Sequence, residues 1–168
     1  MDQSPAPVRI PDLAERPFDL VVEHVFPLSA ARLYTAWTEQ FDVWFAAPGS
    51  VLMKAQVNAP FFFETEYKVE TQSVAKRHPH YGRFLRLVPD RLVQITWVTG
   101  AGGTEGAETV VTVEFRPQGD GCRLKLTHAG FATAASRDAT ERAWPMVFEQ
   151  MQRKLAHRRE QDNEGGTG

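Results

Sequence analysis

The clearest pattern of hydrophobic and polar positions lies in the last third of the chain. Residues 108–131 form two alternating runs, which are separated by the turn sequence Pro-Gln-Gly-Asp-Gly at 117–121. In the second run, charged or polar residues alternate with Cys122, Leu124, Leu126 and His128. Strict alternation is typical of a strand with one buried face. The pattern therefore predicts a long antiparallel hairpin.

One long amphipathic helix is expected after this hairpin. Over residues 137–158, apolar side chains recur three and four positions apart, which is the spacing of one helical face. Pro145 lies inside this segment, and an interior proline costs about 3 kcal/mol relative to alanine. We therefore expect the regular helix either to begin near Trp144 or to be kinked at the proline. Its apolar stripe should pack on the sheet.

Shorter patterns fill the first two thirds of the chain. Ser29 is a plausible N-cap for a short helix, and Pro48-Gly49 ends a second one. The expected helices span residues 30–38 and 39–45, and the expected strands span residues 18–25, 51–57, 61–70, 81–88 and 92–98. Strands do not alternate with long helices, so the sheet should be antiparallel. The sequence thus predicts an α+β fold, with a curved sheet of about six or seven strands.

One domain with short extensions is expected. A chain of 168 residues with 42% hydrophobic content is long enough to bury one core. Residues 1–16 are polar and rich in proline, and residues 159–168 are polar with several glycines. Such segments cannot bury enough apolar surface to order themselves. We expect a mobile N-terminal arm, a single domain over residues 17–158 and a disordered tail.

Net charge bears on the expected classes of binding partner, and cysteine content bears on the expected cellular compartment. Nineteen basic and twenty-one acidic residues give a formal net charge of -2, which favours neither nucleic acid nor an anionic membrane. The single cysteine, Cys122, excludes an intrachain disulfide and fits a reducing compartment. No apolar run approaches the ~20 residues of a membrane span. We expect a cytoplasmic protein.

Four patches of sequence carry a resemblance to a known group. They are residues 27–45, 81–97, 110–131 and 143–155. Their order resembles the START-like (Bet v 1-like, SRPBCC) superfamily, and within it the homologues of the C-terminal domain of the heat-shock-protein-90 (Hsp90) ATPase activator. The resemblance implies a helix-grip fold, in which the long C-terminal helix lies on the sheet. It also implies a ligand-binding or chaperone-associated domain, and some relatives in the superfamily are polyketide cyclases.

Residues with catalytic or metal-binding potential are few. His78-Pro79-His80 offers two imidazoles, but no third ligand is visible nearby, so we interpret it as a polar loop before the next strand. Residues 100–106 are rich in glycine but connect two strands, unlike a phosphate-binding loop. His128 continues the inward face of its strand, either as a hydrogen-bonded strand-end residue or as a contact in a cavity. No catalytic residue, metal or cofactor is expected.

The sequence favours binding of a small hydrophobic or aromatic molecule between the sheet and the last helix. Tyr67 and His128 are the expected polar anchors. The complete set of expected contacts is Trp44, Phe63, Tyr67, Trp97, Val113, His128, Trp144, Phe148 and Met151. A chaperone-associated interaction protein is one alternative, and a polyketide cyclase or aromatase is another. Exposed strand edges suggest a homodimer.

Overall fold

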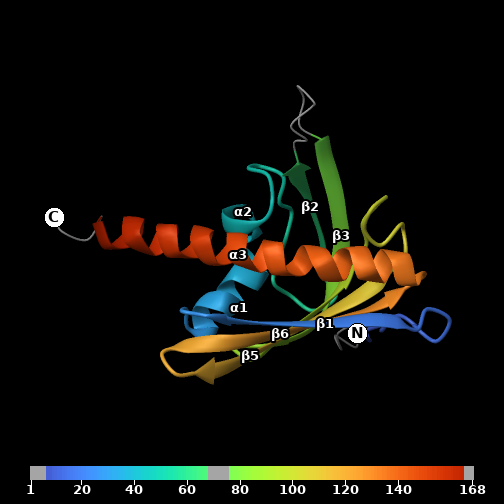
Figure 1. Ribbon diagram of the computed structural model, residues 1–168, viewed down its shortest axis with the longest axis horizontal. Coiled ribbons are helices and arrows are strands. Elements are labelled where there is room, and N and C mark those ends of the chain that lie inside the picture. The colour runs from blue at the N-terminus through green and yellow to red at the C-terminus, as the bar shows by residue number, and fades with distance from the viewer. Residues whose placement is uncertain (1–6, 68–75, 165–168) are drawn as a thin grey trace, which may run out of the picture.

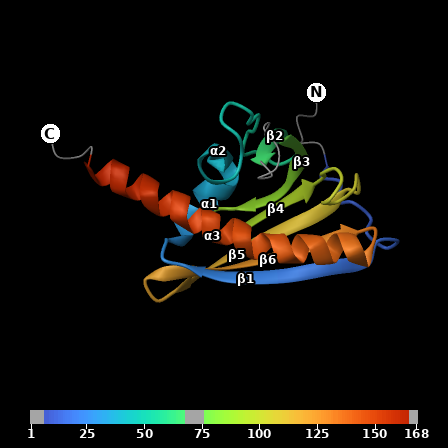
Figure 2. The same ribbon diagram turned by 45° about the horizontal axis from the view of Figure 1, so that its top comes forward.

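One six-stranded antiparallel sheet forms the body of the protein (Figures 1 and 2). The computed structural model describes residues 7–67 and 76–164. The sheet order is β1-β6-β5-β4-β3-β2. The strands are β1 (Phe18–Phe26), β2 (Pro60–Tyr67), β3 (Lys76–Val88), β4 (Leu92–Trp97), β5 (Thr109–Gln118) and β6 (Gly121–Phe131), and the helices are α1 (Ala30–Glu39), α2 (Phe41–Trp44) and α3 (Ala134–Glu164). The predicted α+β helix-grip fold is confirmed.

The β5–β6 hairpin is built as the alternating pattern predicts. Val113 pairs with Leu126 and Val111 pairs with His128 in the antiparallel register. The inward residues of β6 are fully buried at Cys122, Leu124, Leu126 and His128. Because this strand has one face on the core and the other in solvent, its sequence carries a period of two residues. The same burial fixes the register of the pair.

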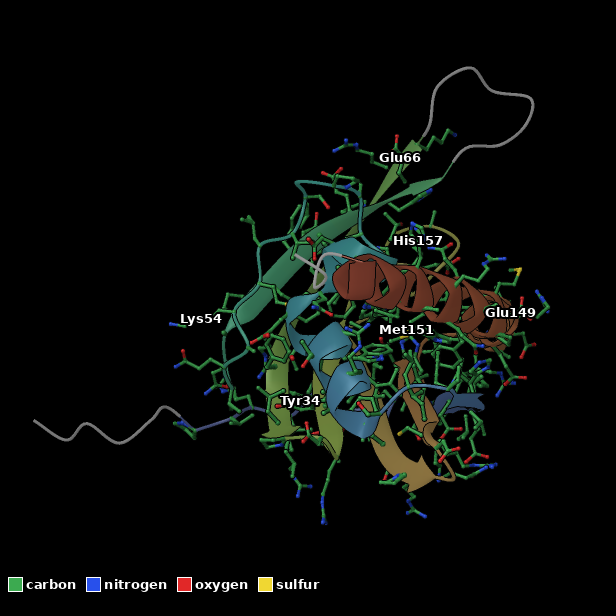
Figure 3. The ribbon with its side chains drawn as sticks, turned by 90° about the vertical axis from the view of Figure 1, so that its left-hand side faces the viewer. Tyr34, Lys54, Glu66, Glu149, Met151 and His157 are labelled. Atoms are coloured by element: carbon green, nitrogen blue, oxygen red, sulfur yellow. The ribbon has the colours of Figure 1, made fainter. Side chains whose placement is uncertain are left out.

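Helix α3 lies across the sheet, and its C-terminal end extends past it (Figures 1 and 2). Met151 lies among the core side chains beneath the helix, whereas Glu149 lies on its outer side (Figure 3). The helix begins at Ala134, well before Trp144, so a start near Trp144 is wrong. Pro145 is exposed, and solvent can therefore satisfy the Glu141 carbonyl that lacks its helical partner. The helix also continues past residue 158.

Two short helices cover the other part of the core. Ser29 caps α1, since its hydroxyl oxygen accepts a hydrogen bond from the backbone N–H of Arg32 at 3.1 Å. The indole N–H of Trp44 in α2 donates to the carbonyl of Ala36 at 2.8 Å, which joins the two helices. Phe41 stacks on Phe63 of β2 with 4.9 Å between ring centroids. The helices predicted over residues 30–38 and 39–45 are thus present, the second as a single turn.

Two predicted elements differ from the structure. Residues 51–57 form no strand and contribute one isolated bridge, Leu52 to Phe62. Leu52 is 71% exposed, so its apolar side chain does not mark a core position. Strand β3 begins at Lys76, so the polar loop predicted around Pro79 is wrong. This part of β3 pairs with β2 alone, and a proline is tolerated on such an edge.

The N-terminal segment contacts the sheet where the structure describes it. The guanidinium of Arg16 donates to the carbonyls of Gly130 at 2.8 Å and Glu108 at 2.6 Å. Residues 1–6 and 165–168 of the predicted arm and tail, and residues 68–70 of a predicted strand, lie outside the described residues. None of the helices in the described part of the chain is long and apolar enough to cross a membrane.

Candidate functional site

A cavity of about 570 Å³ lies between α3 and the β2–β4 side of the sheet. Small-molecule sites occupy roughly 300–1,000 Å³ and are lined mainly by apolar and aromatic groups. The loop from β4 to β5 forms one border. The lining residues are Phe45, Thr65, His78, His80, Trp97, residues 99–104, His128, Thr140, Ala143, Trp144 and Val147. The cavity therefore has the size of a ligand site and combines aromatic rings with a few polar groups.

Three aromatic rings give the cavity flat walls. Trp97 ends β4, and Trp144 lies on the inward stripe of α3. Their ring centroids are 5.8 Å apart with an interplanar angle of 47°. Phe45, just after α2, stacks on Trp97 at 6.1 Å and 28°. Flat π-surfaces of this kind favour planar aromatic ligands through offset or edge-on contacts.

His128 is held in one tautomer by a buried hydrogen-bond chain. The indole N–H of Trp144 donates to its Nδ1 at 3.2 Å, so Nδ1 carries no proton. The hydroxyl of Thr109 donates to the carbonyl of Trp97 at 2.5 Å. The Thr109 oxygen must therefore accept the remaining bond, 2.7 Å from Nε2 of His128. Both ring nitrogens are satisfied by the protein, and the chain fixes the indole of Trp144.

His80 faces the same cavity from β3. Its Nδ1 lies 3.0 Å from the carbonyl oxygen of His78. Since a carbonyl can only accept, Nδ1 carries the proton in the neutral ring. The imidazole stacks on Phe63 with centroids 4.8 Å apart and 14° between planes. Phe45 and Trp97 approach it edge-on at 5.4 Å and 5.1 Å.

Burial keeps both histidines neutral. Loss of hydration lowers the pKa of His80 to about 4, although its hydrogen bond to His78 acts in the opposite direction. The same cause lowers the pKa of His128 to about 3. Desolvation disfavours the charged imidazolium because an apolar surrounding cannot replace water. Both side chains are therefore uncharged hydrogen-bonding groups at neutral pH.

The glycine-rich loop between β4 and β5 is tied at its base and to α3. The backbone N–H of Thr99 donates to the hydroxyl of Thr104, and the N–H of Thr104 donates to the hydroxyl of Thr99, each at 2.8 Å. The hydroxyl of Ser136 donates to the carbonyl of Gly103. The segment is a strand-to-strand connection, as predicted. These bonds hold it at the border of the cavity.

The structure divides the predicted contact residues into three groups. Trp97, His128 and Trp144 line the cavity. The side chain of Tyr67 lies outside the described residues. The others are buried in the core and do not line the cavity: Trp44, Phe63, Val113, Phe148 and Met151. Ligand contact by any of them stays a prediction.

Sequence reasoning missed His80 and Phe45 as cavity residues. His80 was hidden because Pro79 was interpreted as part of a loop. Extending the strand upstream of Tyr81 would have placed His78 and His80 on one face, opposite Thr65 and Phe63 of β2. Within the described ranges 7–67 and 76–164, no three His, Cys, Asp or Glu side chains gather to hold a metal ion.

Comparisons with known proteins agree with this fold. The model of the Activator of Hsp90 ATPase homolog 1-like protein family matches residues 27–156. No curated protein matches the chain. One similar solved structure is that of protein CV1439 from Chromobacterium violaceum, which is 20% identical to this chain with a TM-score of 0.68. The match covers 82% of this chain and 96% of that one. Another is that of the AHSA1 protein from Silicibacter pomeroyi, which is 20% identical with a TM-score of 0.67. This match covers 84% of this chain and 99% of that one.

A third similar structure is that of a protein in a biosynthetic locus. DynU16, from the dynemicin biosynthetic locus, is 13% identical with a TM-score of 0.64, and the match covers 87% of this chain but 48% of that one. At such identities these structures show a shared fold. The family model, in contrast, covers most of the domain and confirms the resemblance found in the sequence. The chain belongs to the family of Activator of Hsp90 ATPase homolog 1-like proteins.

Proposed function

We propose that the protein binds a small, flat aromatic or hydrophobic molecule in the cavity between α3 and the sheet. The observation that carries the proposal is the aromatic lining of this cavity by Phe45, Trp97 and Trp144. Its volume of about 570 Å³ suits a compound of a few fused rings. Burial of apolar ligand surface, at about 25 cal/mol per Å², supplies the affinity.

Binding without chemistry is favoured over a cyclase-like reaction. The cavity residues that the structure describes include no carboxylate, amine or thiol, so acid–base chemistry would depend on its three histidines, His78, His80 and His128, and the two buried ones are poorly suited to it. His128 has both nitrogens engaged by Trp144 and Thr109. Strong burial also moves the pKa values of His80 and His128 far below 7, whereas efficient general acid–base catalysis needs a pKa near the working pH.

A thermal-shift screen of aromatic, lipid-like and polyketide-like compounds tests the proposal. A compound at a hundred times its Kd stabilises the folded state by about 2.7 kcal/mol, which raises the Tm by about 5 to 10 °C for a domain of this size. We expect planar aromatic compounds to give this rise. Absence of stabilisation by every compound, in a folded sample, would contradict the proposal.

Two variants of α3 locate the binding. Ala143 lines the cavity, and Ala143→Phe should fill part of it and abolish the ligand-dependent rise in Tm. Met146 is 65% exposed on the same helix, so Met146→Phe introduces the same ring away from the cavity. This control variant should respond to ligand as the wild type does. An equal response of both variants would place the binding elsewhere.

Association with a chaperone is the second candidate, because the matching family is described by activation of the Hsp90 ATPase. This function would depend on the protein surface, and the cavity would not be required. A purified Hsp90-type chaperone should then hydrolyse ATP faster when the protein is added, and Ala143→Phe should leave that stimulation intact. Ligand stabilisation without ATPase stimulation supports the binding proposal instead.

A further inference from the structure

The two buried histidines at the cavity differ in what they can offer a ligand. His128 donates from Nε2 to Thr109 and accepts at Nδ1 from Trp144. Its two ring nitrogens are therefore already used, and a ligand could bond to them only by displacing a protein partner. His128 therefore holds the Trp144 wall in place, and a direct hydrogen bond from it to a ligand stays a prediction.

His80 has one ring nitrogen without a protein partner. The Nδ1 proton is donated to the carbonyl of His78, so Nε2 of the neutral ring is an acceptor. No group in the described parts of the chain hydrogen-bonds to Nε2, and this nitrogen is not among the fully buried side-chain atoms that lack a partner, so it remains accessible from the cavity. A ligand that covers Nε2 must supply a hydrogen bond to it, because buried acceptors in folded proteins are nearly always satisfied by protein, water or ligand.

The surroundings of His80 restrict how a partner can reach this nitrogen. Phe63 covers one face of the imidazole at 4.8 Å. Phe45 and Trp97 stand edge-on beside it, with interplanar angles of 83° and 77°. These neighbours are hydrocarbon surfaces except for the Trp97 indole N–H. The cavity that His80 lines is the remaining direction of approach.

We propose that the ligand carries a hydrogen-bond donor, such as a phenolic hydroxyl or a ring N–H, that binds Nε2 of His80 while its ring lies against Phe45 and Trp97. This inference rests on the proposed function and specifies the chemical class of the ligand. The low pKa of His80, about 4, supports it because the imidazole stays an uncharged acceptor at neutral pH. A carboxylate would meet a lone pair and be disfavoured.

The proposal predicts discrimination between similar compounds that differ in whether they carry one hydrogen-bond donor. An apolar or ether-bearing analogue would displace solvent from Nε2 without replacing its hydrogen bond, and a buried unsatisfied acceptor costs about 1–3 kcal/mol, which is about 5- to 150-fold in affinity. Three probes separate this effect from size: 2-naphthol has the donor, its methyl ether is larger without the donor, and naphthalene is smaller without it. We expect 2-naphthol to bind at least about 10-fold more tightly than both analogues.

Calorimetric titration of wild type, His80→Phe and His80→Gln tests the inference. Phenylalanine keeps a ring against Phe63 but has no acceptor, so His80→Phe should bind all three probes with similar affinity. Glutamine places an amide oxygen near the position of Nε2, so His80→Gln should recover much of the preference for 2-naphthol. Melting curves and circular dichroism of each variant verify the fold.

The outcomes separate this inference from the proposed function. If wild type binds 2-naphthol and both analogues within about twofold, or if His80→Phe keeps the preference, the donor proposal is overturned while cavity binding stands. If none of the probes binds and the compound screen also finds no ligand, the proposed function falls and the donor proposal falls with it.

Discussion

Acidification from pH 7 to pH 5 should weaken the fold through His80 and His128. Both are buried as neutral rings, with pKa values of about 4 and about 3, and each has a pKa near 6.5 when the chain unfolds. Between these values the unfolded chain binds protons that the folded protein does not. The free energy of unfolding therefore falls as the pH drops below 6.5.

The magnitude follows from proton linkage. Each histidine contributes a loss of about 2 kcal/mol between pH 7 and pH 5, so the two together cost about 4 kcal/mol. A domain has a total stability of about 5–15 kcal/mol, so the loss is easily measured. Glu23 also has a lowered pKa, caused mainly by its hydrogen bond to Arg123. Its effect on stability falls at a lower pH than the range from 7 to 5.

Urea unfolding followed by tryptophan fluorescence at pH 7, 6 and 5 measures the effect. His128→Asn and His80→Phe each remove one titrating ring, so each should reduce the pH-dependent loss to about 2 kcal/mol. The double variant should show little dependence. Baseline stabilities will differ, because His128→Asn also loses the bond to Thr109, but the comparison is made within each variant. A wild-type loss below about 1 kcal/mol, or an unchanged loss in the double variant, would show that the two histidines do not cause the pH dependence.

Two further substitutions test the hydrogen-bond chain and the long helix, both by urea unfolding. Thr109→Val leaves Nε2 of His128 without an acceptor and should lower the free energy of unfolding by about 1–3 kcal/mol. The control Thr112→Val, at a half-buried position of the same strand, should lower it by less. Equal losses would contradict the buried hydrogen-bond chain. Pro145→Ala should stabilise the protein by up to about 3 kcal/mol, because Pro145 is an exposed interior residue of α3, and a loss of stability would show that the proline fits the helix better than alanine.

The sequence predicted those elements in which burial is one-sided. In β6 and α3, polar and apolar positions repeat with the period of the element, so both were found. Residues 51–57 have a similar composition but leave Leu52 in solvent, and there the prediction was wrong. The start of β3 was missed for a different reason: this part of the strand pairs with β2 alone, and a segment with one free side can contain Pro79. The local pattern of polar and apolar residues indicates which side chains are buried. Whether a strand has a free edge depends instead on which strands pair with it.

The position of the cavity depends on where α3 crosses the sheet, which no local pattern encodes. Periodicity correctly placed Phe148 and Met151 on the inward stripe, but both lie in the filled core. Trp144, on the same stripe, lies at the edge of the cavity. The pairing of Phe63 with His80 arises only when β2 and β3 meet. Periodicity therefore identifies the inward faces, and tertiary packing decides which inward side chains border open space.

Titration of 2-naphthol into wild type, Ala143→Phe and Met146→Phe, followed by calorimetry, is the most direct test of ligand binding in the cavity. We expect saturable binding of one molecule per chain to wild type and Met146→Phe, and loss of that binding in Ala143→Phe. Saturable binding of equal affinity to all three proteins would contradict it, since the ligand would then occupy another site.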